Sequence, residues 1–254
     1  AAPKVQDGFP EAARKPASDS VRHVTATAYH INKGVKKHMK ILVTGGAGFI
    51  GSHLMRTLEA AGHEAIALDN LSTGLRENLL PHMKLIVMDT HDKAVEDVFK
   101  KEHFDAVVHL AAQTLVSDSM TDPEHDMHEN IAGTVRILEC CRKYGVKRII
   151  FSSSAATYGD VADSALPISE TLPQQPLSFY GLTKKTAENY LELYRLAYGI
   201  DYVILRFANV YGERQGDGGE GGVISIFAKR IAEGKGITIF GDGNQTRDFV
   251  YAGD

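Results

Sequence analysis

The sequence lacks a long apolar segment, a large charge of either sign and a framework of cysteines. No apolar run in its 254 residues approaches the roughly 18 residues that a membrane-spanning helix needs, so we expect a soluble protein. The formal net charge of -4 gives no sign of a nucleic-acid partner. Cys140 and Cys141 are adjacent and point in different directions on an expected helix, so we expect no disulfide between them and a cytoplasmic location. With 43% hydrophobic residues, the chain can bury a large core.

Residues 1–38 differ in composition from the rest of the chain. They carry seven Lys or Arg against three Asp or Glu, which gives a net charge of +4 against -8 for the remainder. Because the first expected strand follows Met39 directly, we expect Met39 to be the natural start and residues 1–38 to be an extension, a tag or a disordered leader. A mitochondrial transit peptide is the competing hypothesis, but Asp7, Glu11 and Asp19 are unusual in such acid-poor segments.

Short apolar segments alternate with helical patterns along the body of the chain. The expected strands are residues 41–43, 64–68, 84–88, 105–110, 147–151 and 201–206. The expected helices run from the glycine-rich turn to Leu58 and over residues 92–101, 123–144 and 180–198. Such alternation predicts an α/β fold with a doubly wound parallel sheet, in which ligands bind beyond the carboxyl ends of the strands.

A glycine-rich turn joins the first expected strand to the first helix. Gly45, Gly48 and Gly51 follow at the spacing G-x-x-G-x-x-G. In such a turn the first glycine permits a tight bend, the second lets backbone N–H groups approach a pyrophosphate, and the third allows close packing of helix and strand. Asp69 lies 18 residues beyond Gly51, where a carboxylate can accept hydrogen bonds from an adenosine ribose and would repel a 2'-phosphate. The turn therefore predicts binding of a dinucleotide, and Asp69 favours NAD over NADP.

Small polar residues follow the other expected strands and would form one rim with this turn. They are Asp89–Thr90, Ala111–Gln113 and Ser152–Ser154. Tyr180 and Lys184 are four residues apart at the start of a helix, so their side chains share one face. An adjacent ammonium favours the phenolate form of a tyrosine, which can then act as a base, while the last serine supplies a second hydrogen bond to a substrate oxygen.

Seven motifs occur in order along the chain after Met39. They are Thr44-Gly-Gly-Ala-Gly-Phe-Ile-Gly51, Asp69-Asn-Leu-Ser-Thr-Gly74, His109-Leu-Ala-Ala112, Ser152-Ser-Ser-Ala-Ala-Thr-Tyr-Gly159, Tyr180-Gly-Leu-Thr-Lys184, Leu205-Arg-Phe-Ala-Asn-Val-Tyr-Gly212 and Arg247-Asp-Phe-Val-Tyr251. Together they resemble the extended short-chain dehydrogenase/reductase family, specifically nucleotide-sugar epimerases of the UDP-glucose 4-epimerase type. The resemblance implies an NAD-dependent isomerase of carbohydrate metabolism that inverts C4 of a UDP-glucose or UDP-galactose type of sugar through a 4-keto intermediate.

The resemblance also implies the domains and the site residues. Residues 39–206 would form an NAD-binding Rossmann domain, and residues 207–254 an incomplete substrate-binding lobe. Ser154, Tyr180 and Lys184 match the family's catalytic triad. The residues expected to bind NAD are Gly45, Gly48, Phe49, Ile50, Asp69, Asn70, Ser72, Gly74, Asp89, Thr90, Leu110, Ala111, Ala112, Gln113, Ser152, Tyr180, Lys184 and Phe207. The residues expected to contact the UDP-sugar are Ser154, Asn209, Val223, Thr238, Phe240 and Arg247.

Related reactions are separated by the segment after Ser154. Dehydratases of this kind usually carry an Asp-Glu pair there, and decarboxylases of UDP-glucuronate carry a glutamate in the same loop, whereas this chain has Ala155-Ala156. Epimerisation is therefore favoured over dehydration or decarboxylation, while glucose, N-acetylhexosamine and uronic acid all remain open as the sugar. The family normally continues beyond the last motif, so a catalytically incomplete NAD-binding fragment is the second hypothesis.

Three further features concern metals, support and partners. His125 and His128 are spaced like helical metal ligands, but they lie among acidic residues at an expected exposed helix start, so we expect no metal site. We interpret Asn130 as a buried helix residue that supports the segment Ser152–Ser154, which we call the serine segment. Resemblance to the family implies a homodimer formed through helices 123–144 and 180–198. The net charge and the lack of a long apolar run predict no nucleic-acid or membrane partner.

Overall fold

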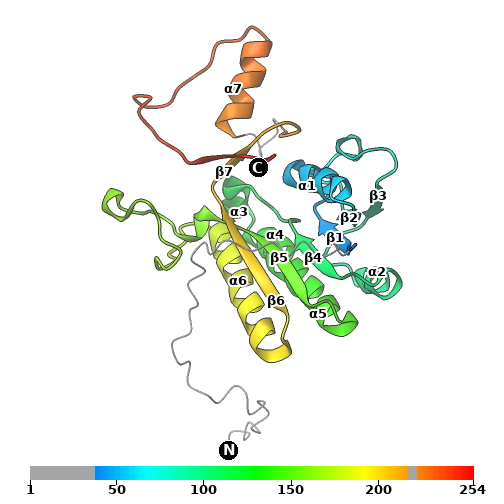
Figure 1. Ribbon diagram of the computed structural model, residues 1–254. Coiled ribbons are helices and arrows are strands. Elements are labelled where there is room, and N and C mark those ends of the chain that lie inside the picture. Colours follow the sequence, from blue (N-terminus) through cyan, green and yellow to red (C-terminus); the bar gives the residue numbers. More distant parts are fainter. Residues whose placement is uncertain (1–37, 217–221) are drawn as a thin grey trace, which may run out of the picture.

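Six parallel strands form the central sheet of the protein. The structure, a computed structural model, describes residues 38–216 and 222–254, so the expected extension lies outside it except for His38. The strands are β1 (Lys40–Thr44), β2 (Glu64–Asp69), β3 (Lys84–Val87), β4 (Ala106–His109), β5 (Arg148–Ser154) and β6 (Asp201–Phe207). Their order across the sheet, β3-β2-β1-β4-β5-β6, is that of a doubly wound fold and confirms the expected fold class (Figure 1).

Helices connect the strands and cover the sheet. They are α1 (Phe49–Ala60), α2 (Val95–Glu102), α3 (Val116–Thr121), α4 (Pro123–Met127), α5 (Gly133–Tyr144), α6 (Phe179–Tyr198) and α7 (Val223–Ala232). The single helix expected over residues 123–144 consists of α4, a π-helical turn, η3 (His128–Ala132), and α5. Short 3-10 turns lie at Arg76–Asn78 (η2), Ala155–Thr157 (η4) and Asp163–Ala165 (η5). The short helix α3 was not expected, because six residues hold too few helical repeats to show a period.

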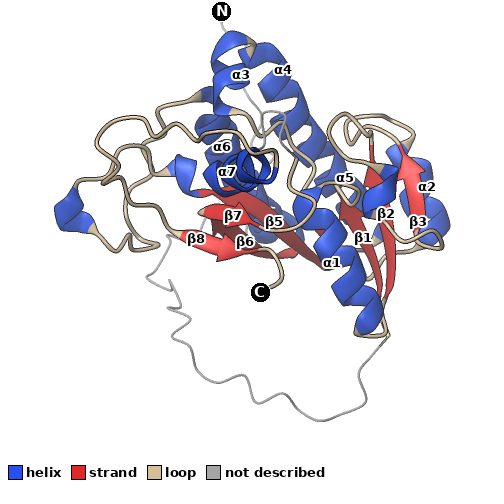
Figure 2. Cartoon of the chain, turned by 90° about the horizontal axis from the view of Figure 1, so that it is seen from above, coloured by secondary structure: helices blue, strands red, loops and turns tan. Residues whose placement is uncertain are grey.

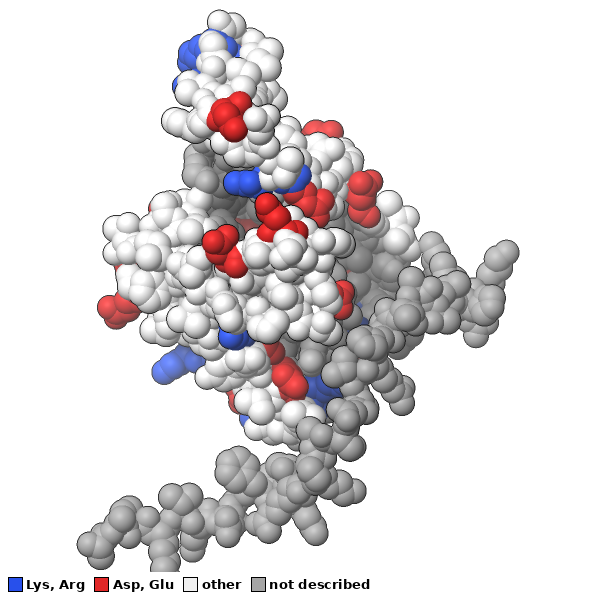
Figure 3. Space-filling model, turned by 90° about the vertical axis from the view of Figure 1, so that its left-hand side faces the viewer, with Lys and Arg blue, Asp and Glu red and all other residues white. Residues whose placement is uncertain are grey.

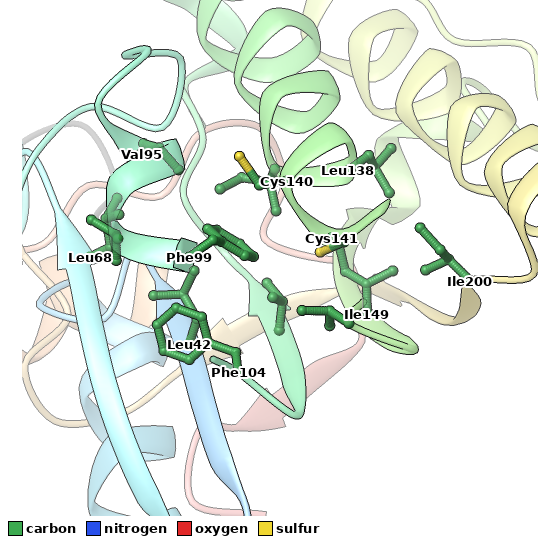
Figure 4. Close-up of a cluster of buried hydrophobic side chains, with 14 of the residues drawn as sticks. Leu42, Leu68, Val95, Phe99, Phe104, Leu138, Cys140, Cys141, Ile149 and Ile200 are labelled. Carbon is green, nitrogen blue, oxygen red and sulfur yellow. The ribbon is translucent and has the colours of Figure 1, made fainter. Parts of the chain in front are cut away.

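Alternate residues of the strands point to opposite faces of the sheet, and each face has its own core. On one face, Leu42 and Ile149 pack with α2, α5 and α6, and Figure 4 shows side chains such as Phe99 and Leu138 in this cluster. On the other face, Ile41 and Val43 pack in a smaller cluster with residues of α1. Strands buried on both faces are nearly continuous in apolar residues, which is why the sequence marked them so clearly.

The termini of α6 follow from local sequence signals. The Ser178 side chain accepts a hydrogen bond from the Gly181 N–H at 3.0 Å and so caps the helix. The helix ends at Gly199, whose φ of 71° lies in the left-handed region that glycine adopts without strain. The cap fixes the first turn of α6, which carries Tyr180.

The three serines of the fifth strand lie inside β5, which corrects the expectation that they follow it. The strand β5 extends to Ser154 because it pairs with β6 along its whole length, from Arg148 opposite Asp201 to Ser154 opposite Phe207. Only the residues after Ser154 leave the sheet, as the short 3-10 turn η4.

The C-terminal segment forms a smaller unit beside the sheet. Strands β7 (Asn209–Tyr211) and β8 (Phe249–Tyr251) pair in parallel, and α7 projects away from the body of the molecule (Figures 1 and 3). The Arg214 Nε donates a hydrogen bond to the Ser52 Oγ at 2.8 Å and so links this segment to α1. Figure 2 shows the same segment from above, with α7 seen nearly end-on. A separate substrate lobe over residues 207–254 stays a prediction.

Two features bear on the environment of the protein. Among the described residues, no helix combines the length and the apolar character needed to cross a membrane. Both Cys140 and Cys141 are buried and free, and burial raises the pKa of the Cys140 thiol to about 11. A thiol that stays protonated is a poor nucleophile, so this cysteine packs as a small apolar residue. A cytoplasmic location stays a prediction.

The third glycine of the turn tests how tightly α1 packs on β1. A Cβ added at Gly51 would lie 2.0 Å from the carbonyl oxygen of Gly45, which is backbone that cannot move aside cheaply. We expect Gly51→Ala to lower the free energy of unfolding by about 1–3 kcal/mol or more, measured by urea denaturation. The matched control is Gly236→Ala, where a Cβ meets nothing within 4 Å. Equal stability of the two variants would contradict the close packing.

Candidate active site

A cavity of about 410 Å³ lies at the carboxyl ends of the strands, where the fold predicts a ligand site. It extends from the glycine-rich turn to the start of α6. The predicted site residues that line it are Gly45, Gly48, Phe49, Ile50, Asp69, Asn70, Ser72, Thr90, Leu110, Ala111, Ala112, Ser152, Ser154, Tyr180, Lys184 and Phe207. The structure thus brings the expected catalytic triad and most of the expected cofactor residues to one cavity.

The glycine-rich turn makes one end of this cavity. Gly45 has a φ of 68°, and a Cβ there would lie 2.8 Å from the backbone nitrogen of Ala111, so the position requires glycine. Helix α1 begins after Gly48, and among the residues that the structure describes no side chain caps its start. Its first N–H groups therefore remain available to an anion at the positive end of the helix dipole. The turn fits the pyrophosphate of a dinucleotide.

Next to the glycine-rich turn, Asp69 connects that turn to the loop that follows β2. One carboxylate oxygen accepts a hydrogen bond from the Ala47 N–H and the other from the Leu71 N–H, both at 2.9 Å. A Cβ on Gly74 would lie 2.8 Å from this carboxylate, so Gly74 packs against Asp69 rather than lining the cavity. A carboxylate can accept about four hydrogen bonds, so Asp69 retains capacity for ribose hydroxyls.

Two other expected cofactor residues act through neighbours in this structure. Asp89 accepts a hydrogen bond from the Asn70 side chain and does not line the cavity. Gln113 also lies outside the lining, and its backbone is bound on both sides by Asn130, with the N–H donating to the amide oxygen at 2.8 Å. Asn130 therefore supports the loop after β4, which corrects our interpretation that it supports the serine segment.

A buried histidine locks the loop after β4 onto β1. His109 is 1% exposed, and burial followed by the charge of Lys184 lowers its pKa to about 3, so its ring is neutral. The Thr134 hydroxyl donates to the Asn130 carbonyl at 2.6 Å, so it accepts from His109 Nε2 at 3.0 Å. The other ring nitrogen, Nδ1, then accepts from the Thr44 hydroxyl at 2.7 Å.

This histidine continues a chain of hydrogen bonds that reaches the cavity wall. The Thr44 oxygen accepts from the backbone N–H groups of Leu110 and Ala111, both at 3.2 Å. The chain explains why His109-Leu-Ala-Ala112 is a motif: the histidine fixes the backbone that its small neighbours present to the cavity. No sequence period signals this role, since the partners come from β1 and α5.

Lys184 lies in the wall at the other end of the cavity. Its side chain is 2% exposed, its ammonium donates to the Ser152 carbonyl at 3.0 Å, and it lies 5.8 Å from the centroid of the Tyr180 ring. Burial lowers the pKa of Lys184 to about 8, and the nearby Asp126 carboxylate opposes that shift. The ammonium is thus held beside the tyrosine, as the i, i+4 spacing predicted.

Asp126 is a buried carboxylate that sequence analysis missed. It is 0% exposed, and it accepts hydrogen bonds from the Thr183 hydroxyl at 2.8 Å and from the Asn130 amide at 3.1 Å. Burial raises its pKa. The contacts tie α4 to the first turns of α6, so they hold the segment that carries Tyr180 and Lys184.

A second missed group joins the ends of β5 and β6 to α6. The Glu188 carboxylate accepts a hydrogen bond from Ser153 and three from the Arg206 guanidinium, of which the shortest is 2.7 Å. Arg206 also donates to the Tyr158 hydroxyl at 2.6 Å, and these contacts raise the pKa of the arginine. A bidentate pair of this kind fixes two elements in both distance and orientation. Glu188 lies 35 residues from Ser153 and 18 residues from Arg206 in the chain, so no local sequence pattern indicates these contacts.

The expected substrate residues divide into two groups. Ser154 lines the cavity, and its side chain accepts a hydrogen bond from the Ala156 N–H at 3.1 Å. The others lie outside the cavity lining: Asn209, Val223, Thr238, Phe240 and Arg247. All five are exposed, and Phe240 is 84% exposed. Contacts from these five residues to a UDP-sugar stay predictions.

The fold and the site together define a class of enzyme. The protein combines a doubly wound sheet with a cavity that has a glycine-rich turn at one end and a serine, a tyrosine and a buried lysine at the other. This combination is typical of enzymes that carry out oxidation and reduction with a dinucleotide cofactor. Residues 41–254 match the model of the NAD dependent epimerase/dehydratase family. The chain belongs to this family.

Solved structures of related proteins agree with this assignment. The UDP-glucose 4-epimerase of Thermotoga maritima, solved with UDP-glucose, is 44% identical with a TM-score of 0.81, over 84% of this chain and 70% of that one. The UDP-glucose 4-epimerase of Thermus thermophilus, solved with NAD, is 42% identical with a TM-score of 0.80, over 85% and 71%. The UDP-N-acetylglucosamine 4-epimerase of Methanobrevibacter ruminantium, solved with UDP-N-acetylmuramic acid, is 37% identical with a TM-score of 0.81, over 85% and 70%.

The cofactor of this protein is NAD, as the sequence predicted. Its residues fit that cofactor, since the turn at Gly45 leaves no room for a side chain, the α1 N-terminus is uncapped and Asp69 lines the cavity.

The charge of Asp69 gives a test of cofactor choice. We expect Asp69→Asn to weaken NAD binding and to lower the ratio of the NADP and NAD dissociation constants by about tenfold or more, because the carboxylate no longer repels the 2'-phosphate. Calorimetric titration of cofactor-free protein measures both constants. The control is Asp92→Asn, an exposed residue whose carboxylate accepts a hydrogen bond from the nearby Ala94 N–H. An unchanged ratio would show that Asp69 does not face the ribose.

The buried ammonium gives a test that does not depend on activity. The pKa of Lys184 is about 8 in the folded protein and 10.5 as the ordinary value, so the unfolded state binds more protons between these pH values. Stability of the wild type should therefore rise with pH across that window relative to Lys184→Met, by at most about 3 kcal/mol. Urea denaturation at pH 7 to 10.5 measures the difference.

The adjacent lysine supplies the control for that measurement. Lys185 is only partly buried, with its ammonium donating to the Gln174 carbonyl at 2.8 Å, so Lys185→Met should change the pH dependence less. If the difference in stability between the wild type and Lys184→Met stays constant between pH 8 and 10.5, the conclusion that burial desolvates the Lys184 ammonium is wrong.

Proposed function

We propose that this protein epimerises a UDP-sugar of the UDP-glucose and UDP-galactose type at C4, with NAD as a tightly held cofactor. The observation that carries the proposal is the convergence of Ser154, Tyr180 and Lys184 at one end of a cavity whose other end is the dinucleotide-binding turn. Family membership and the similarity to solved UDP-glucose 4-epimerases support the same reaction.

The side chains have distinct parts in this reaction. Tyr180, as the phenolate, takes the proton of the sugar 4-hydroxyl and later returns it to the 4-keto oxygen. Ser154 donates a hydrogen bond to the same oxygen, and the Lys184 ammonium stabilises the negative charge on Tyr180. When bound, NAD supplies the hydride acceptor and donor at C4. Because the sugar must turn between the two transfers, binding contacts have to fall on the nucleotide part of the substrate.

Residues for that binding are part of the proposal. We assign the diphosphate to Asn209 and Arg247 and the nucleotide base to Val223, Thr238 and Phe240, on the resemblance of their motifs. Asn209 is held at the start of β7, where its side chain donates to the Asp248 carbonyl at 3.2 Å, which places the two motif segments side by side.

Dehydration and decarboxylation are less well supported than epimerisation. Relatives that catalyse these reactions usually carry a carboxylate after the catalytic serine, whereas the 3-10 turn η4 that follows Ser154 is Ala155–Thr157. We also propose a homodimer through residues 123–144, which hold α4, η3 and α5, and through α6. The support is a set of exposed apolar side chains on α6: Leu182, Tyr190, Leu193, Leu196 and Tyr198.

Replacement of the tyrosine hydroxyl tests the reaction. We expect Tyr180→Phe to lower the rate of UDP-galactose to UDP-glucose conversion by about 10²–10⁴-fold, because the base is lost, while NAD stays bound. Chromatography of the two sugars measures turnover, and absorbance after denaturation measures released NAD. Tyr202→Phe, on β6 and outside the cavity lining, is the control and should keep full activity.

The outcomes separate the two hypotheses for this chain. Turnover that Tyr180→Phe abolishes supports the epimerase. Bound NAD without turnover in the wild type supports a cofactor-binding fragment. A Tyr180→Phe variant that retains the wild-type rate would remove the tyrosine from the mechanism.

A further inference from the structure

Two histidines and a glutamate from distant parts of the chain meet beside the cofactor cavity. His91 follows β3 by four residues, while His128 and Glu129 open the π-helical turn between α4 and α5. One ligand atom from each residue lies within 4.8 Å of the other two. We refer to these three residues as the His-His-Glu cluster.

The separations within the cluster suit a small divalent ion. The His91 Nδ1 lies 3.5 Å from the Glu129 Oε1, and the His128 Nδ1 lies 4.0 Å from the same oxygen. A tetrahedral zinc ion with bonds of about 2.0–2.2 Å places its ligand atoms about 3.4 Å apart. Small rotations of the partly exposed side chains are therefore enough to close the shell.

The state of His91 is a second, independent observation. Its Nδ1 atom is buried and has no hydrogen-bond partner within the described part of the chain. A buried polar atom without a partner is destabilising, so such atoms are uncommon in folded proteins. The ring lies 4.2 Å, centroid to centroid, from the His128 ring. A coordinated cation would satisfy the orphaned nitrogen.

The backbone at the cluster is also unusual. The turn His128–Ala132 is π-helical, whereas the helices on either side are regular α-helices. Single π-turns inside α-helices are rare and occur frequently at functional sites. Here the turn carries both the Glu129 side chain that lines the cavity and the Asn130 amide that holds the loop after β4.

We propose that His91, His128 and Glu129 bind a divalent transition-metal ion of the zinc type, at the end of the cofactor cavity lined by Thr90. Two imidazoles and one carboxylate favour Zn²⁺, Co²⁺ or Ni²⁺ over Mg²⁺ and Ca²⁺, which prefer oxygen ligands. Three protein ligands leave a coordination position for water or another ligand. The ion ties the segment after β3 to the α4–α5 helix and adds positive charge to the cavity wall. The proposal does not depend on epimerase activity.

The structure changes the pair of histidines that the sequence suggested. His125 and His128 have the i, i+3 spacing of helical ligands, but His125 is exposed and is not part of the cluster. Its backbone N–H instead donates a hydrogen bond to the Asp122 carboxylate at 3.0 Å. The partner of His128 is His91, 37 residues earlier in the chain. His125 therefore serves as a matched control on the same helix.

Metal binding to the full chain tests the site directly. We expect metal-free protein to bind Zn²⁺ in a saturable calorimetric titration, and Co²⁺ to give the intense visible absorption of a four-coordinate site. His91→Ala, His128→Ala and Glu129→Gln should each weaken the tightest binding by about tenfold or more, because each removes a ligand. His125→Ala should bind as the wild type does, and Mg²⁺ should not compete.

Thermal unfolding provides a second measurement that also detects misfolded variants. Zn²⁺ should raise the Tm of the wild type and of His125→Ala and leave the Tm of His91→Ala unchanged. Without metal, the variants should melt close to the wild type. The protein contains 11 histidines, so binding elsewhere is the competing result. Zn²⁺ binding that is absent, or that is equal in His91→Ala and His125→Ala, overturns the proposal.

Discussion

The parallel pairing of the six strands is the constraint on which the rest of the structure depends. Parallel hydrogen bonding brings all carboxyl ends to one edge, so the segments after β1, β2, β3, β4 and β5 meet although they lie far apart in the chain. Close packing of Gly51 in α1 against the backbone of Gly45 holds the glycine-rich turn at this edge. Every group that lines the cavity takes its position from this arrangement.

Buried polar side chains then fix the edge in detail. Thr44 and His109 bind the segment after β4 to β1, and Glu188 binds the ends of β5 and β6 to α6. Each of these groups has its hydrogen bonds satisfied, so burial costs little and the low dielectric strengthens them. Apolar packing alone would leave the loops free to slide. The polar contacts therefore fix the positions of Lys184 and of the loops that line the cavity.

The sequence predicted the sheet, most of the helices and the cofactor end of the site, because these follow from local patterns. Buried strands are continuous in apolar residues, and the glycine spacing at Gly45–Gly51 is typical of the turn between a strand and a helix that binds a dinucleotide. Helix caps such as Ser178 are equally local. The predicted end of β5 was wrong, because pairing with β6, and not composition, carries the strand to Ser154.

The groups that the sequence did not reveal depend on contacts between distant elements. Asp126 and Glu188 resemble ordinary helix-surface acids in the sequence and become buried only when α4 and α6 meet their partners. Asn130 was correctly expected to be buried, but its partner, the backbone of Gln113, could not be inferred from spacing. Apolar periodicity says which face of a helix is covered, not which side chain lies opposite.

The carboxylate of Asp69 has a consequence for when the binding site becomes ordered. It holds the Ala47 and Leu71 segments by two hydrogen bonds from the protein's own backbone. The entropy of arranging both loops is therefore spent during folding and not at the encounter with the cofactor. Binding to such a preformed cradle needs little rearrangement, so cofactor retention becomes a property of the folded state itself. Loss of local order around Asp69 would release the cofactor before the sheet unfolds.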